Sequence, residues 1–223
     1  RLIKSFEVNI FFIKEFFRCR KKNYTLNYPY RYLTYAPWFE KDFLEKFEDI
    51  KDHTLVTEDR VFIIQQLFAY CCNLKGDVAE CGVFQGGTAL FLAKQISCRC
   101  GQNSKYLYLF DTFTGMPETA KKSRDGHVAG DFANTSFENV KNLVTEFDFV
   151  KIYPGEIPET FTTIKDKDFC FVHIDVDLYT STLDCLKFFY DRMVAGGMLL
   201  CDDYGFYQYQ KAAKAAVDEF LCD

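Results

Sequence analysis

Four aspartates at the ends of two apolar segments are the residues of this sequence that are best suited to bind a cation or to accept a proton. Asp175 and Asp177 close a run that reads Phe-Cys-Phe-Val-His-Ile-Asp-Val-Asp, and Asp202 and Asp203 follow Leu-Leu-Cys. Continuous apolar runs of this kind are typical of strands buried on both faces of a parallel sheet. Ligands bind outside the carboxyl ends of such strands, which lie about 4.8 Å apart. One small cation would therefore bridge the carboxylates, and hard oxygen ligands favour Mg²⁺ or Ca²⁺ over Zn²⁺.

A glycine-rich loop follows the first predicted strand, which covers residues 77–81. The loop, residues 82–87, reads Gly-Val-Phe-Gln-Gly-Gly and leads into a predicted helix over 88–96. Its glycines permit close approach of a ligand, and the start of the helix offers free N–H groups. Phe84 stands where the second glycine of the dinucleotide motif would admit a pyrophosphate. The loop therefore favours a nucleotide-like cofactor without a pyrophosphate over NAD, although alone it indicates only a tight strand-to-helix turn.

A second strand is predicted over residues 106–110 and ends at Asp111. An acid at this distance beyond a glycine loop binds ribose hydroxyls in such folds. The polar segment 121–134 then shows no periodicity, and a loop of this length is typical of a functional or disordered segment.

The remaining segments alternate between helix and strand. Thr135 and Ser181 begin capping-box patterns, and Gly196-Gly197 are expected to end a helix before the last strand. Further helices are predicted over 43–50, 59–72, 135–147, 160–166, 181–195 and 208–221, and further strands over 149–153, 169–177 and 198–201. This order predicts an α/β fold with a doubly wound, mostly parallel sheet and helices on both faces.

Composition limits the class of protein and its surroundings. The length of 223 residues suits one domain, and a net charge of −5 argues against a nucleic-acid binder. The ten cysteines match no zinc template, so they are expected as buried free thiols in a reducing cytosol. No signal peptide or membrane span is recognisable. These features predict a cytoplasmic protein that does not bind nucleic acid.

The N-terminal region carries no catalytic motif. Residues 2–20 form an amphipathic helical pattern, for which packing or an oligomer contact is favoured over weak contact with a membrane surface. Residues 24–39 are aromatic and irregular, as expected of a lid or a subunit contact. A homo-oligomer is therefore expected.

Taken together, the motifs resemble the macrocin O-methyltransferase (TylF/MycF) family from about Thr54 onward. The segments that carry the resemblance are ECGVFQGG at 80–87, FDTFTGMP at 110–117, DFANTS at 131–136, HIDVDLYTST at 173–182 and DDYG at 202–205. The resemblance implies a Rossmann-like class I enzyme that uses S-adenosylmethionine and a divalent metal, usually Mg²⁺, to methylate a sugar hydroxyl. It also implies a helical extension over 1–50 that is followed by a catalytic domain over 51–223. This catalytic domain is expected to lack the family's closing β-hairpin.

The resemblance further assigns roles to individual residues. It implies metal ligands at Asp175, Asp202 and Asp203, and a general base at Asp177. The positions that it implies for S-adenosylmethionine are Glu80, Gly82, Val83, Phe84, Gly86, Gly87, Asp111, Thr112 and Ser136.

The expected chemistry follows from the carboxylates. A sugar hydroxyl has too high a pKa to attack a sulfonium methyl at neutral pH, and coordination to Mg²⁺ stabilises the alkoxide. Asp177 then accepts the proton, and a vicinal diol that chelates the ion is the expected acceptor. A phenol or catechol-like acceptor and a non-catalytic nucleotide-binding module remain as alternatives. His173 is expected in the core, whereas His127 is within reach of substrate.

Overall fold

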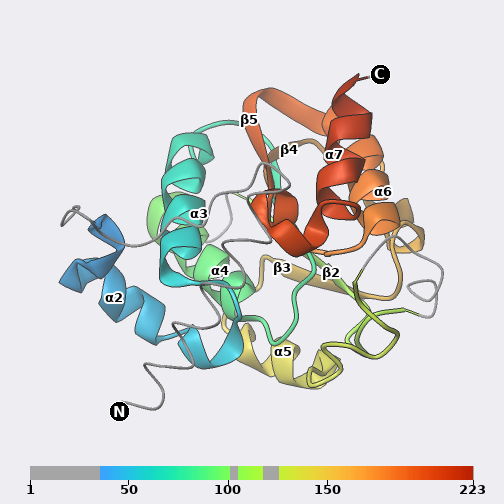
Figure 1. Ribbon diagram of the computed structural model, residues 1–223. Coiled ribbons are helices and arrows are strands. Elements are labelled where there is room, and N and C mark those ends of the chain that lie inside the picture. Colours follow the sequence, from blue (N-terminus) through green and yellow to red (C-terminus); the bar gives the residue numbers. More distant parts are fainter. Residues whose placement is uncertain (1–35, 101–104, 118–125, 223) are drawn as a thin grey trace, which may run out of the picture. The chain divides into compact units, whose positions relative to one another are not determined.

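The computed structural model describes residues 36–100, 105–117 and 126–222 (Figure 1). The chain divides into two units, Arg1–Ala36 and Pro37–Asp223. The helix predicted over 2–20 and most of the aromatic segment 24–39 lie outside the described residues. Helix α2 (Lys41–Glu48), which the sequence placed in the N-terminal extension, belongs to the second unit. In the described part of the chain, no helix is long and apolar enough to cross a membrane.

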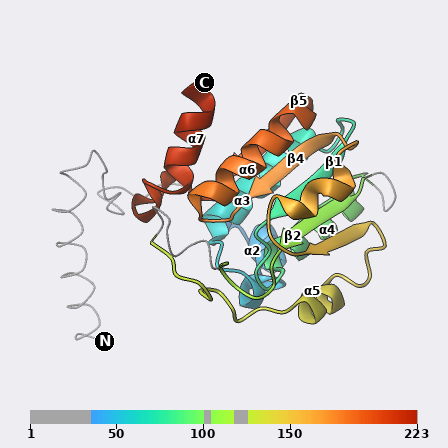
Figure 2. The same cartoon turned by 90° about the vertical axis from the view of Figure 1, so that its right-hand side faces the viewer.

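A sheet of five parallel strands forms the centre of the second unit (Figure 2). The strands are β1 (Asp77–Cys81), β2 (Leu107–Asp111), β3 (Val150–Pro154), β4 (Phe169–Ile174) and β5 (Met193–Cys201). They lie in the order β3-β2-β1-β4-β5, and every neighbouring pair is parallel. The predicted doubly wound α/β fold is confirmed.

Helices cover both faces of this sheet. They are α3 (Glu58–Cys71), α4 (Gly87–Cys100), α5 (Phe137–Leu143), α6 (Tyr179–Phe189) and α7 (Ala213–Cys222), with a short 3-10 helix, η4 (Glu159–Ile164), before β4. Alternate strand residues point to opposite faces. Val78 therefore packs in one hydrophobic core with α3 and α4, whereas Ala79 packs in a second core with α6 and α7.

The boundary between α6 and β5 differs from the prediction. Helix α6 begins at Tyr179, so Ser181 lies inside the helix and does not cap it. Strand β5 already begins at Met193 and runs through the two glycines that were expected to end the helix. The pairing of β4 with β5 shifts register between Phe169 and Phe171, and Gly196 has a φ of +83°. These glycines therefore accommodate a bulge, which is a common role of glycine within a strand.

Two other helices begin later than predicted. Helix α5 is capped by Ser136, one residue after Thr135, and the Ser136 hydroxyl accepts a hydrogen bond from the Asn139 N–H at 3.2 Å. The last helix begins at Ala213, because the segment before it forms two 3-10 turns, η6 (Asp202–Gly205) and η7 (Tyr207–Tyr209). Both turns lie at the carboxyl end of the sheet and contribute to the site.

Candidate active site

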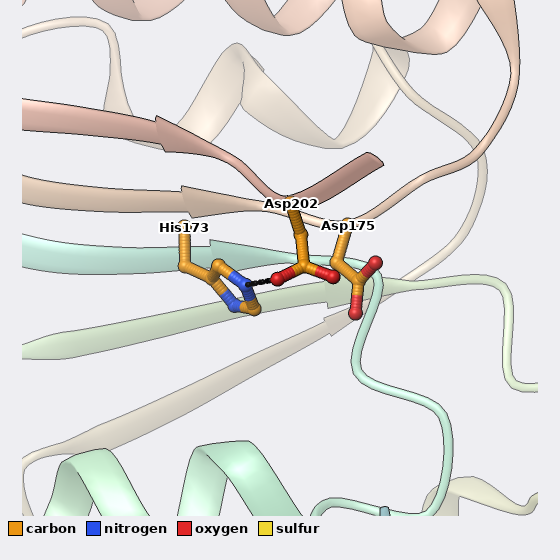
Figure 3. Close-up of side chains that lie close together, drawn as sticks. All are labelled: His173, Asp175 and Asp202. Atoms are coloured by element: carbon orange, nitrogen blue, oxygen red, sulfur yellow. Dashed lines mark ion pairs between the residues drawn. The ribbon is translucent and has the colours of Figure 1, made fainter. Parts of the chain in front are cut away.

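The register of the sheet brings the carboxylates of β4 and β5 together. His173 pairs with Leu200, and Ile174 pairs with Cys201, so Asp175 and Asp202 leave adjacent strands at the same level. Figure 3 shows the side chains of His173, Asp175 and Asp202 gathered at this edge. Each of the three offers a potential metal-ligand atom, and these atoms lie within 4.8 Å of one another. The predicted meeting of the two strand ends is therefore present.

His173 sits between two carboxylates. Its Nδ1 lies 3.1 Å from Oε1 of Glu80, and its Nε2 lies 3.8 Å from Oδ1 of Asp202. Burial alone would lower the pKa of His173, but the carboxylates of Asp202 and Glu80 raise that pKa to about 10. A protonated imidazole has no free lone pair to coordinate a metal. His173 therefore acts as a buried counter-ion to the acids, in the core position expected from the sequence.

Asp203 and Asp177 form the second half of the acid cluster. Oδ2 of Asp203 accepts a hydrogen bond from the backbone N–H of Asp177 at 3.0 Å. Asp177 has a φ of +56°, and such left-handed backbone is uncommon outside glycine and is concentrated at functional sites. The turn after β4 thus directs Asp177 toward the other acids.

The electrostatics of the cluster fit a divalent cation. Burial, and then repulsion from neighbouring carboxylates, raises the pKa of Asp175 well above its usual range and raises that of Asp203 to about 7. Burial also raises the pKa of Asp177. Buried carboxylates of like charge disfavour ionisation unless a positive charge compensates. A hard cation would supply that charge for Asp175 and Asp203. Asp202, the third predicted oxygen donor, already faces the His173 imidazolium.

Arg60, which is not among the predicted site residues, joins this cluster from helix α3. Its guanidinium forms an ion pair with Oδ2 of Asp202. It also donates a hydrogen bond to the Leu55 carbonyl at 3.0 Å and lies over the Phe206 ring at 5.0 Å. Because Arg60 and Asp202 are far apart in sequence, no local pattern marks this contact.

The glycine loop is held by Asp111 at the end of β2. Oδ2 of Asp111 accepts hydrogen bonds from the backbone N–H groups of Val83 and Phe84, at 2.7 and 2.9 Å. A Cβ at Gly82 would lie 1.8 Å from the carbonyl oxygen of Asp175. Only glycine therefore allows the ends of β1 and β4 to approach this closely.

A cavity of about 530 Å³ opens where these strand ends meet. This volume falls in the range typical of small-molecule sites, about 300–1,000 Å³. Its lining includes the acids Asp175, Asp177 and Asp203 together with the loop that follows β1. The cavity therefore places an acid cluster and a glycine loop around one small-molecule site.

The predicted cofactor residues fall into two groups. Five of them line the cavity: Gly82, Val83, Phe84, Asp111 and Thr112. The other four, all within the described residues, lie outside the lining: Glu80, Gly86, Gly87 and Ser136. Glu80 is fully buried against His173, and Ser136 caps α5. These placements leave the first group as the better candidates for direct contact.

The lining also contains residues that are not predicted from the sequence. They include Thr54, Arg60, Gly155, Glu156, Phe206 and Tyr209. The turn at Gly155 follows β3, so the rule that parallel strands end at one edge would have found it. Tyr209 lies in η7, within the range 208–221 that is predicted as the last helix.

Comparison with known proteins agrees with this arrangement. Residues 46–222 match the family model described as macrocin-O-methyltransferase (TylF). The chain is 28% identical over 180 residues to the demethyldecarbamoylnovobiocin O-methyltransferase of Streptomyces niveus, covering 75% of this chain and 67% of that protein. It is 27% identical over 168 residues to the 8-demethyl-8-(2,3-dimethoxy-alpha-L-rhamnosyl)-tetracenomycin-C 4'-O-methyltransferase of Streptomyces olivaceus, covering 68% of this chain and 62% of that protein.

A solved structure of an O-methyltransferase is also similar to this chain. The O-methyltransferase NovP superposes with a TM-score of 0.64 at 26% identity, covering 76% of this chain and 74% of that chain. The present chain spans about two thirds of the length of the curated relatives above. Its fold is that of class I O-methyltransferases. Because the family model matches most of its length, the chain belongs to the TylF macrocin-O-methyltransferase family.

Proposed function

We propose that the protein transfers the methyl group of S-adenosylmethionine to a hydroxyl of a sugar or a sugar-containing natural product, with the help of Mg²⁺. The observation that carries this proposal is the acid cluster of Asp175, Asp177 and Asp203 facing the same cavity as the glycine loop. Family membership supports O-methylation. The rhamnosyl group in the name of the Streptomyces olivaceus relative supports a sugar acceptor.

The glycine loop and Asp111 are the residues that would hold the methyl donor. Asp111 already accepts backbone hydrogen bonds from the loop, and a carboxylate has about four acceptor positions. It can therefore position the loop and accept hydrogen bonds from ribose hydroxyls at the same time. Phe84 lines the cavity beside it and leaves less room for a pyrophosphate than a glycine would.

Asp177 is the residue that we assign as general base. When bound, S-adenosylmethionine would supply an electrophilic methyl group, and Asp175, Asp202 and Asp203 would hold a divalent cation whose charge would lower the pKa of the acceptor hydroxyl. Burial raises the pKa of the Asp177 carboxylate, which makes Asp177 a stronger proton acceptor.

A vicinal diol is the proposed acceptor, because two adjacent hydroxyls would fix the reacting oxygen in one orientation. A catechol-like phenol presents the same pair of oxygens and is the second candidate. Both would place one oxygen near Asp177 and the other near the remaining acids.

The test is a methyl-transfer assay with S-adenosylmethionine and either Mg²⁺ or chelator. The acceptors are a glycoside with a vicinal diol, its monodeoxy counterpart and a catechol, with mass spectrometry as the readout. The proposal expects Mg²⁺-dependent methylation of the diol glycoside and little methylation of the monodeoxy form. If none of the acceptors is methylated while S-adenosylhomocysteine binds, the proposed acceptor class is wrong.

A further inference from the structure

Arg60 lies on the cavity side of the acid cluster. It lines the cavity and is paired with Oδ2 of Asp202, whereas Asp202 is not part of the lining. The Arg60 side chain is 23% exposed and that of Asp202 is 4% exposed. In the part of the chain that the structure describes, no ion pair involves Asp175 or Asp203. Arg60 therefore places its positive charge at one acid of the cluster, between that acid and the cavity.

The oxygen that Arg60 binds is the one that a shared cation would need. Figure 3 shows one carboxylate oxygen of Asp202 joined to His173 and the other directed toward Asp175. The oxygen joined to His173 is Oδ1, which lies 3.8 Å from Nε2. The oxygen directed toward Asp175 is therefore Oδ2, the partner of Arg60. Because the potential ligand atoms of Asp202 and Asp175 lie within 4.8 Å of each other, a cation between them would meet the Arg60 guanidinium.

Of the two basic side chains beside Asp202, His173 is fixed in the core. Its ring is fully buried, and its Nδ1 lies 3.1 Å from Oε1 of Glu80 on the neighbouring strand. A ring held in this way between two strands has no space into which it could withdraw. The oxygen that faces His173 is therefore closed to a further ligand.

Arg60 has the freedom that His173 lacks, because its other contacts do not involve Asp202. Its Nη2 donates to the Leu55 carbonyl at 3.0 Å, and its Nε donates to the Thr57 hydroxyl at 3.3 Å. The guanidinium also lies 5.0 Å from the centre of the Phe206 ring. These contacts would keep the side chain at the cavity wall after Nη1 has left the carboxylate.

We propose that Arg60 is the built-in counter-ion of Asp202 and gives up Oδ2 of this carboxylate when a divalent cation binds, so that Arg60 and the cation compete for one oxygen. This inference rests on the proposed function and adds Arg60 to it as a positioning residue. A buried carboxylate without a positive partner is strongly destabilising. The exchange leaves Asp202 compensated in both states, and it keeps the affinity for the cation low.

The alternative is that Arg60 and the cation share Oδ2. An ionised carboxylate has about four acceptor positions, so Arg60 would then orient Asp202 for the cation. The two arrangements predict opposite effects of removing Arg60. Competition predicts tighter binding of the cation, whereas sharing predicts weaker binding.

The test measures the affinity for Mn²⁺ of wild type and Arg60→Gln, with free Mn²⁺ read by electron paramagnetic resonance. Mn²⁺ takes the same carboxylate ligands as Mg²⁺, and Gln removes the charge but keeps an amide donor. The proposal expects Arg60→Gln to bind about tenfold more tightly, because a charged hydrogen bond no longer has to be given up. Lys94→Gln is the matched control, since Lys94 pairs with Asp49 outside the cavity lining. Its affinity should equal that of wild type.

A double-mutant cycle with Asp202→Asn separates competition from a general effect of charge. Competition predicts that Arg60→Gln tightens binding only while Asp202 is present. Loss of one positive charge near the acids would instead tighten binding in both backgrounds. If Arg60→Gln does not fold, as judged by circular dichroism, Asp202→Asn is compared with Asp175→Asn. Asp202 releases an ion pair when it binds the cation and Asp175 does not, so Asp202→Asn should weaken binding less.

The outcomes distinguish this inference from the proposed function. Unchanged or weaker Mn²⁺ binding by folded Arg60→Gln would overturn the competition and leave the proposed function intact. The same conclusion would follow from an equal gain in the Asp202→Asn background or, where Arg60→Gln does not fold, from a loss in Asp202→Asn as large as that in Asp175→Asn. If neither wild type nor Arg60→Gln binds Mn²⁺, the metal in the proposed function is wrong, and the inference with it.

Discussion

Glu80 and His173 lie side by side on β1 and β4, with Oε1 of Glu80 3.1 Å from Nδ1 of His173 and neither side chain exposed. Their contact follows from the register, which pairs these two residues directly. His173 connects in turn to Asp202, so the pair supports the acid cluster from within the core.

Glu80→Gln should lower the free energy of unfolding. The substitution leaves the buried imidazolium with only the more distant Asp202 carboxylate, 3.8 Å away, and loss of one member of a buried ion pair costs about 3 kcal/mol. Urea unfolding measures the change. The control is Asp49→Asn, because Asp49 pairs with Lys94 at 2.8 Å on the surface and exposed pairs contribute less than about 1 kcal/mol. An equal loss of unfolding free energy in both variants would contradict the role of the Glu80–His173 pair.

The contribution of His173 to stability should depend on pH. Its pKa is raised from 6.5 to about 10 in the folded protein, so protonation favours the folded state. The difference in unfolding free energy between wild type and His173→Gln should be largest below pH 6.5 and decrease between pH 6.5 and about 10. Unfolding in chelator at several pH values measures it. A difference that grows with pH would show that His173 is buried in its neutral form.

Asp111→Asn should weaken binding of S-adenosylhomocysteine. The charged carboxylate accepts hydrogen bonds from the N–H groups of Val83 and Phe84, and loss of such a charge-assisted bond corresponds to about a tenfold change in affinity. Isothermal titration calorimetry measures the effect. Asp77→Asn is the matched control, since Asp77 accepts a similar bond from the Tyr106 N–H at 2.9 Å near the opposite end of β1. Unaltered affinity in Asp111→Asn would remove Asp111 from the cofactor site.

Gly82→Ala should disrupt the fold at the site. Gly82 has a φ of +85°, and an added Cβ would lie 1.8 Å from the Asp175 carbonyl oxygen. The strands would have to separate, so a large fall in thermal unfolding temperature is expected. Gly205→Ala serves as the control, because nothing lies within 4 Å of a Cβ at Gly205. A stable Gly82→Ala protein would mean that β1 and β4 can separate without loss of the fold.

The sequence predicts the strands and their shared edge well, for a physical reason. A strand buried on both faces must be apolar throughout, so β4 is visible as a continuous run that ends in Asp175 and Asp177. Parallel strands carry their carboxyl ends to one edge, and this rule places Asp202 and Asp203 beside them. The acid cluster could therefore be anticipated without any contact information.

Contacts between distant segments are not visible in the sequence. The Arg60–Asp202 ion pair joins helix α3 to the end of β5, and the contact between His127 and Tyr209 joins two segments that are also far apart in sequence. Prediction from local sequence also fails where one residue type suits two structures. The sequence predicts a helix end at Gly196, but this residue occupies a bulge within β5, because glycine suits both positions.

The most direct measurement for the central claim compares wild type with Asp177→Asn in single-turnover methyl transfer, alongside calorimetry with S-adenosylhomocysteine and Mg²⁺. The amide keeps the size of the side chain but cannot accept the hydroxyl proton. The account predicts that Asn lowers the rate by about 100-fold or more, as expected for loss of a general base, while both ligands still bind. An unchanged rate with intact binding would contradict the assignment of Asp177 as the base.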